Sequence, residues 1–93
     1  MTFDFDPAKS RRNFENHGID FEEAQRLWDG NHVVIPAKNV QGEGRFAILG
    51  KIESKVYVGI FTVRDDVTRI ISCHRADKKW EGIYYEHLQK KET

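Results

Sequence analysis

Arginine, histidine, glutamate and tyrosine side chains gather near the ends of the segments that read as β-strands. Arginine suits phosphate binding, because its planar guanidinium donates two parallel hydrogen bonds and keeps its proton. Histidine suits proton transfer near neutral pH, since its unperturbed pKa is about 6.5. Together these side chains can cleave RNA, because RNA carries its own nucleophile, the 2′-hydroxyl. The candidates are Glu43, Arg45, Arg64, Arg69, His74, Arg75, Tyr84 and Tyr85.

The predicted roles of these residues follow from their charge and pKa. Arg64 and Arg75 are expected to neutralise the phosphate, and His74 or Glu43 to transfer the proton. A glutamate does this near neutral pH only if its pKa is raised. The residues expected to bind or position the substrate are Arg45, Arg69 and Tyr84. The competing interpretation is structural: strand-end arginines reach into solvent, and the Glu-x-Arg sequence at 43–45 is a solvated ion pair.

A predicted β-hairpin over residues 55–75 carries most of these candidates. Residues 55–63 are rich in β-branched and aromatic types, and Asp65-Asp66 supplies the turn. Regular alternation puts Arg69, Ile71, Cys73 and Arg75 on one face of the second strand, and Ile70, Ser72 and His74 on the other. His74 and Arg75 therefore share a site only if the strand bends or ends there. A two- or four-residue loop aligns Arg64 with Arg69 and Arg75, whereas a three-residue loop does not.

The rest of the chain predicts an α+β domain around this hairpin. Asp6-Pro7 begins a helix that runs to about Asn16, and Asp20 begins a second helix over residues 21–28. Strands are predicted at 32–36, 45–52, 55–63 and up to residue 75, and a helix follows Asp77. Sequential strands usually pair as neighbours, so we expect one four-stranded, mainly antiparallel sheet covered by the C-terminal helix. The fold class is α+β, with a single domain over residues 1–93.

Composition narrows the class of protein. The 93 residues carry zero net charge, so any nucleic-acid binding depends on a local patch of charge. A DNA-contacting role for the basic first helix, with Lys9, Arg11 and Arg12, is disfavoured because these are few charges beside Asp4 and Asp6. No segment resembles a signal peptide or a membrane span, so a cytoplasmic protein without membrane contact is expected.

The sequence also narrows the kind of site. The single cysteine, Cys73, excludes an intramolecular disulfide and reads as a small buried hydrophobe. The four histidines, residues 17, 32, 74 and 87, are too scattered to read as a metal cluster. There is no glycine-rich phosphate loop, HExxH sequence or nucleophile elbow. We therefore expect chemistry without a metal or a cofactor.

Three stretches resemble the BrnT family of toxins from bacterial type II toxin–antitoxin systems. They are DFDPAKSRRNFENHGIDFEEAQRLWDG, GEGRFAILG and FTVRDDVTRIISCHRADKKWEGIYYE. The resemblance implies a RelE-like fold and a metal-independent endoribonuclease that inhibits translation. It also implies neutralisation by a BrnA-like ribbon-helix-helix antitoxin, with DNA bound only through that antitoxin. The polar residues that match the family pattern are Lys9, Asn13, His17, Glu43, Arg45, Arg64, Arg69, Ser72 and Arg75.

The chain departs from the family pattern at several positions. Cys73 and His74 stand where alanine and arginine are common, and Phe5 stands where tryptophan is usual. Asn16 replaces a usual lysine, and Trp80 a common charged residue. Exchanging an arginine for a histidine changes phosphate binding and pH dependence. The alternative function is therefore a catalytically weak or inactive toxin-like module that only binds its antitoxin.

Overall fold

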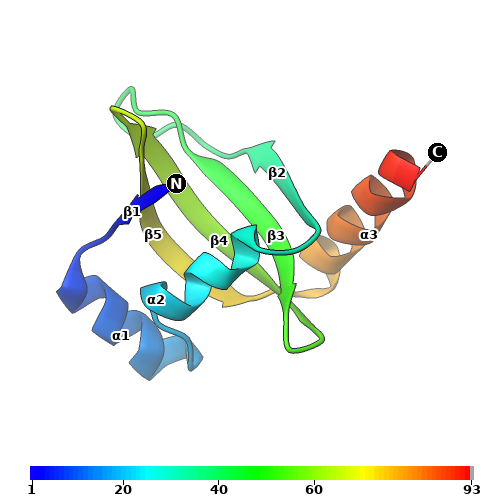
Figure 1. Cartoon of the computed structure of the whole chain (residues 1–93), viewed down its shortest axis with the longest axis horizontal. Coiled ribbons are helices and arrows are strands. Elements are labelled where there is room, and N and C mark those ends of the chain that lie inside the picture. Colours follow the sequence, from blue (N-terminus) through cyan, green and yellow to red (C-terminus); the bar gives the residue numbers. More distant parts are fainter. Residues whose placement is uncertain (93) are drawn as a thin grey trace.

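The computed structural model describes residues 1–92, which form one mixed sheet flanked by helices (Figure 1). The elements are β1 (Thr2–Asp4), α1 (Pro7–His17), α2 (Phe21–Ala24), the 3₁₀ helix η1 (Gln25–Trp28), β2 (His32–Pro36), β3 (Phe46–Ile52), β4 (Lys55–Arg64), β5 (Val67–Arg75) and α3 (Lys78–Glu92). The strand order is β1-β5-β4-β3-β2. The predicted α+β class is confirmed.

The sheet of the described chain has five strands, one more than predicted. Thr2–Asp4 pairs in parallel with Val67–Arg69 of β5, while the other pairings are antiparallel. A three-residue strand carries little sequence signal of its own, because its pairing depends on where the distant β5 lies. The final hairpin, β4 and β5, lies inside the sheet as a result.

The helix boundaries follow the capping residues. Asp6 accepts a hydrogen bond from the Ala8 amide at 2.9 Å and precedes Pro7 at the first helical position. Gly18 ends α1 in a left-handed conformation, φ 74°, that a residue with a Cβ adopts only at a cost. Asp20 caps α2 by accepting from the Glu23 amide at 2.8 Å. The predicted helix over residues 21–28 is one turn of α-helix that continues as η1.

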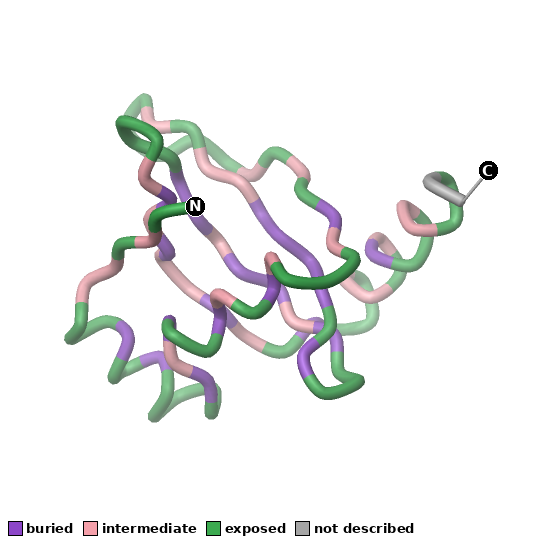
Figure 2. The backbone as a smooth tube through the Cα atoms, viewed as in Figure 1, coloured by how far each residue is buried: buried purple, intermediate pink, exposed green. Residues whose placement is uncertain are grey.

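Each face of the sheet has its own core. The α2 face, beneath α2 and η1, buries residues such as Leu27, Ile48 and Phe61. The α3 face buries a second set that includes Leu49, Val58 and Tyr84. Figure 1 shows α3 at the β2–β3 side of the sheet, away from β1 and β5, and α3 contacts β2 and β3. The tube in Figure 2 is accordingly buried along the central strands and only intermediate along much of β5.

A β-bulge in β5 changes which side chains share a face. Phe61 pairs with Ile70, but the preceding residue, Ile60, pairs with Ser72, so Ile71 is an extra residue. Ile70 and Cys73 therefore both reach the core of the α2 face although they are three residues apart. The predicted regular alternation is wrong, because it assumed that no residue interrupts the pairing.

The turn of the hairpin fixes the place of Arg64. Arg64 pairs with Val67, so Asp65 and Asp66 form a two-residue loop, with φ values of 50° and 66°. Arg64 then shares the α3 face with Arg69, as a two-residue loop predicts. Arg75 lies beyond the bulge and pairs with Tyr57, which belongs to the α2 face. The expectation that Arg69 and Arg75 share a face is therefore wrong.

Candidate functional site

A row of polar side chains crosses the α3 face near the hairpin turn. Asp4 pairs with Arg69, and Arg69 pairs with Thr62 of β4. Arg45 continues the row on the other side of β4. It precedes Phe46, which pairs with Phe61, so Arg45 lies opposite Thr62. We call Arg45, Thr62, Arg69 and Asp4 the arginine row. At roughly 4.8 Å between neighbouring strands, the backbones of its two arginines lie about 10 Å apart.

Two arginines of this region are paired with carboxylates. Arg69 donates to Asp4, and Arg64 donates to both carboxylate oxygens of Glu43, at 2.7 and 2.9 Å. Arg45 forms no ion pair with a described residue, and its buried Nε has no hydrogen-bond partner there. A buried donor without an acceptor is costly, so Arg45 is the guanidinium best placed to take an anion.

Glu43 is held in its charged form. The hydrogen bond from Arg64 lowers the pKa of the Glu43 carboxyl below its usual value, with contributions from Thr62 and Arg45. The same pair raises the pKa of Arg64. Proton transfer near neutral pH requires a raised pKa in a glutamate. The structure therefore disfavours Glu43 as the proton carrier and makes it the partner that orders Arg64.

The Glu43–Arg64 pair predicts an acid-dependent loss of stability. The folded-state pKa of Glu43 lies below the ordinary 4.5, so its contribution is present above that pH and lost as pH falls through the folded value. Glu43→Gln is expected to reduce the fall in urea midpoint between about pH 6 and pH 3. Glu15→Gln, an exposed glutamate on α1, is the matched control. Equal acid sensitivity in wild type and Glu43→Gln would contradict the prediction.

At the other end of β5, a histidine pair forms across two elements. His74 pairs with Val58 and so lies on the α3 face. Its Nδ1 donates to the Arg75 carbonyl at 2.9 Å, because a carbonyl only accepts, which leaves Nε2 as the ring acceptor in neutral imidazole. The ring of His17, the last residue of α1, lies 5.8 Å from the His74 ring between centroids. We call these two residues the histidine pair.

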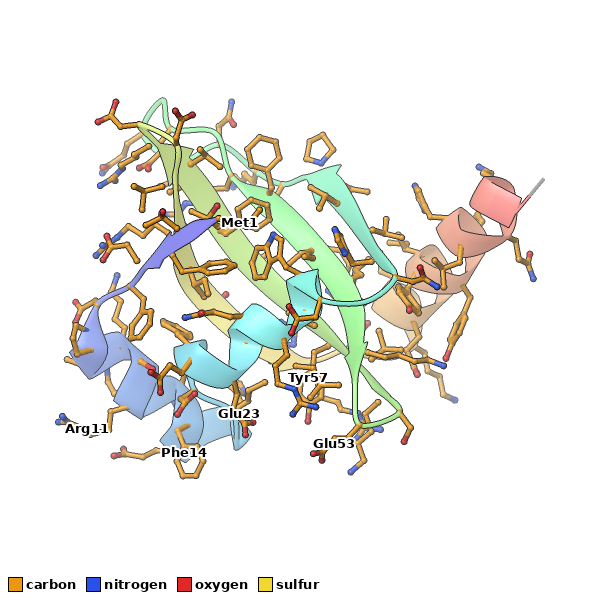
Figure 3. The ribbon with its side chains drawn as sticks, in the orientation of Figure 1. Met1, Arg11, Phe14, Glu23, Glu53 and Tyr57 are labelled. Carbon is orange, nitrogen blue, oxygen red and sulfur yellow. The ribbon has the colours of Figure 1, made fainter. Side chains whose placement is uncertain are left out.

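Asn13 holds α1 against the edge of β5. Its amide donates to the carbonyls of Cys73 and Ile19, both at 2.7 Å, and accepts from the Cys73 amide at 3.3 Å. Side chains four residues apart lie on one face of a helix, so this anchor also turns His17 toward β5. The outer side of α1 carries Arg11 and Phe14, which Figure 3 shows pointing away from the sheet. Sequence reasoning missed the histidine pair, although the Asn13–His17 spacing was a usable signal.

Arg64 and Arg75 are not brought together. They lie at opposite ends of the hairpin, and β5 between them spans roughly 26 Å at 3.3 Å per residue. Arg75 is exposed at the end of β5 on the α2 face, whereas Arg64 is on the α3 face. One phosphate site made by both residues, as expected from the sequence, is therefore not formed.

The candidate Tyr84 and the single cysteine, Cys73, lie in the core. Tyr84 is 2% exposed, and its hydroxyl donates to the Asn31 carbonyl at 3.4 Å. Burial also raises its pKa, so Tyr84 is a packing residue and not the predicted substrate contact. The neighbouring Tyr85 is exposed, with Lys51 over its ring. Cys73 is fully buried and desolvation raises its pKa to about 12, so the interpretation as a buried hydrophobe is confirmed.

What remains on one accessible surface is the arginine row and His74. Arg69, Ser72 and His74 share the α3 face of β5 and are each partly exposed. Arg69 pairs with Thr62 and His74 with Val58, and these two β4 residues are four positions apart. Arg69 and His74 therefore lie about 13 Å apart along the sheet. Within residues 1–92 there is no group of three or more His, Cys, Asp or Glu side chains placed to hold a metal ion. In the same range, no helix has the length and apolar character to cross a membrane.

Comparison with known proteins gives one family. The model of a family described as the ribonuclease toxin BrnT of type II toxin–antitoxin systems matches residues 5–79. The matched range includes the arginine row from Arg45 onward and both members of the histidine pair. A search of curated proteins finds no match.

Proposed function

The chain belongs to the BrnT family of ribonuclease toxins of type II toxin–antitoxin systems, and on this premise we propose a metal-independent endoribonuclease that inhibits translation. The substrate strand lies along β5 on the α3 face. This placement rests on one observation: the arginine row and His74 lie on the same accessible face of the sheet. The cation of Arg69 and the proton carrier His74 are about 13 Å apart on it. That span fits a few nucleotides of extended RNA.

Arg45 and Arg69 bind the phosphates of the bound strand. The Arg45 Nε has no hydrogen-bond partner among the described residues, and Arg69 exchanges its contact with Asp4 for a phosphate when RNA is bound. Arg64 stays paired with Glu43 at the edge of this surface. Arg75 is exposed at the end of β5 on the opposite, α2 face, so it is given no contact with this strand. Arg45 and Arg69 therefore hold the strand by phosphates about 13 Å from the one beside His74.

His74 transfers a proton during attack of the 2′-hydroxyl on the adjacent phosphorus. This attack forms a 2′,3′-cyclic phosphate and releases a 5′-hydroxyl, so the reaction needs no external nucleophile. The free Nε2 of His74 is suited to the proton, because Nδ1 is fixed by the Arg75 carbonyl.

Cleavage of RNA by the purified chain tests the proposal. We expect wild type to cut single-stranded RNA equally well with and without EDTA and to leave 2′,3′-cyclic phosphate ends. His74→Asn should slow cleavage by roughly 10²-fold or more, the usual contribution of a general acid or base. Arg11→Gln, on the outer side of α1, should cleave like wild type. RNA left intact by wild type, or cleavage abolished by EDTA, would overturn the proposed chemistry.

The partner we propose is a BrnA-like ribbon-helix-helix antitoxin, which neutralises the chain and alone contacts DNA. One observation favours the alternative of a weak or inactive module: Arg64 and Arg69 are each paired with a carboxylate inside the chain. Expression of the chain without any partner separates the two functions. Growth arrest that disappears in His74→Asn supports the nuclease, whereas normal growth supports the binding module.

A further inference from the structure

Cleavage through the 2′-hydroxyl needs two proton transfers at one phosphorus. A base removes the proton of the 2′-hydroxyl, and an acid protonates the leaving 5′-oxygen. Attacking and leaving oxygens lie roughly in line across the phosphorus, so base and acid have to reach the same phosphate. One histidine fulfils both roles only by moving between the two oxygens. A second proton carrier beside His74 removes that requirement.

Among the described side chains, the candidates for this second carrier are few. Glu43 is excluded by its position, because it pairs with Arg64 at the opposite end of β5 from His74. Tyr84 is buried, and Cys73 is buried with a raised pKa. His17 is exposed, and its ring lies 5.8 Å from that of His74. His17 is therefore the accessible titratable group placed beside the proposed proton carrier.

We propose that His17 is a second catalytic residue and forms with His74 the acid–base pair of the nuclease. This inference rests on the proposed function and adds a residue from a different element. The rings are tilted by 45° and come from α1 and β5, so a phosphate at the edge of the sheet contacts both. Neither ring forms an ion pair with a described carboxylate.

The proton balance of the step closes within the pair. One imidazole is neutral and takes the proton of the 2′-hydroxyl as the bond from O2′ to phosphorus forms. The other is protonated and gives its proton to O5′ as the bond from phosphorus to O5′ breaks. The products are a 2′,3′-cyclic phosphate and a 5′-hydroxyl, and the two rings end with exchanged protonation states. Proton exchange with solvent restores them for the next turnover.

The hydrogen bonds that position His17 do not involve its imidazole ring. Asn13, one turn earlier on α1, is fixed to the backbone of Cys73, the residue before His74. Hydrogen bonds between Asn13 and the backbone of Cys73 therefore hold the two histidines next to each other. Substrate does not have to displace these bonds in order to bind. Holding both groups in position is what makes acid–base catalysis effective.

The test compares pH–rate profiles of wild type, His17→Asn and His74→Asn on a short RNA. Wild type should give a bell-shaped profile of kcat/KM, and each variant should lose one limb and roughly 10²-fold or more in kcat. A ribonucleoside 3′-nitrophenyl phosphate, whose leaving group needs no acid, should restore the rate of one variant only. His87→Asn, on α3, is the matched control and should behave as wild type. His17→Gln is the second variant if His17→Asn is poorly folded.

The outcomes are separable. An active wild type whose His17→Asn and His17→Gln variants keep both limbs and the full kcat overturns the inference and leaves the proposed function intact. A loss of rate in these variants through KM alone, with an unchanged profile, also overturns it, because it shows a binding role. A wild type that cleaves no RNA overturns the proposed function and the inference together.

Discussion

Asn13→Ala is expected to lower the free energy of unfolding by about 2–3 kcal/mol, since it leaves buried backbone groups without partners. Asn13 is 8% exposed and bonds the Cys73 amide and the carbonyls of Cys73 and Ile19. For a domain of this size the melting temperature should fall by roughly 10–20 °C. Urea unfolding and thermal melting of the two proteins measure the difference.

Two variants separate the hydrogen bonds from the rest of the side chain. Asn13→Asp keeps the shape but lacks the amide donor, and it turns a carboxylate oxygen toward two carbonyls. It should destabilise at least as much as Asn13→Ala. Asn16→Ala, an exposed residue of the same helix, should change stability by less than about 0.5 kcal/mol. A stable Asn13→Ala protein would mean that α1 does not depend on this anchor.

Arg45→Ala is expected to lower kcat/KM for RNA cleavage by roughly 10–10²-fold, mainly through KM, because it removes a charge-assisted hydrogen bond worth about 1.5–3 kcal/mol to a phosphate remote from His74. Among the described residues Arg45 forms no hydrogen bond or ion pair, although its charge lowers the pKa of Glu43, so its guanidinium is available to substrate. Arg69→Ala should cost less, because phosphate binding by Arg69 already competes with Asp4. Steady-state kinetics on one oligonucleotide compare the variants.

The salt dependence of RNA binding gives an independent measure of the same contact. For single strands, the slope of log K against log salt changes by about 0.7 for each neutralised phosphate. A catalytically slow His74→Asn background allows binding to be measured, and Arg45→Ala added to it should reduce the slope by that amount. Arg26→Gln, whose side chain lies near Glu53, is the control. An unchanged slope in the Arg45 variant would place the RNA elsewhere.

The parts of the fold that the sequence predicts are those decided locally. Asp6-Pro7, Gly18 and Asp20 determine helix ends through bonds within a few residues, and Asp65-Asp66 forms the tight turn. The bulge at Ile71 depends on packing of both Ile70 and Cys73 against helices far away in sequence. No local pattern marks that extra residue. It alone moved Arg75 to the opposite face from Arg69.

The candidate site was only partly predictable for the same reason. Arg45, Arg69 and His74 could be chosen by residue type, and the fold keeps them on one surface. The charge state of Glu43 depends on Arg64, 21 residues away, and the burial of Tyr84 depends on how α3 meets the sheet. His17 and His74 are 57 positions apart, so only the docking of α1 brings them together. Residue types suggest a chemistry, and long-range packing decides which residues can carry it out.

The Asn13 anchor also determines where this sheet can grow. β1 pairs with only the first three residues of β5, Val67–Arg69, and the Asn13 amide occupies both backbone groups of Cys73 further along. Unpaired strand edges invite edge-to-edge association with another chain. With β5 closed by a strand and a side chain, the sheet edge open to strand addition is β2. That edge ends at Pro36, which has no amide hydrogen to donate, so an added strand would lack a hydrogen bond at that position.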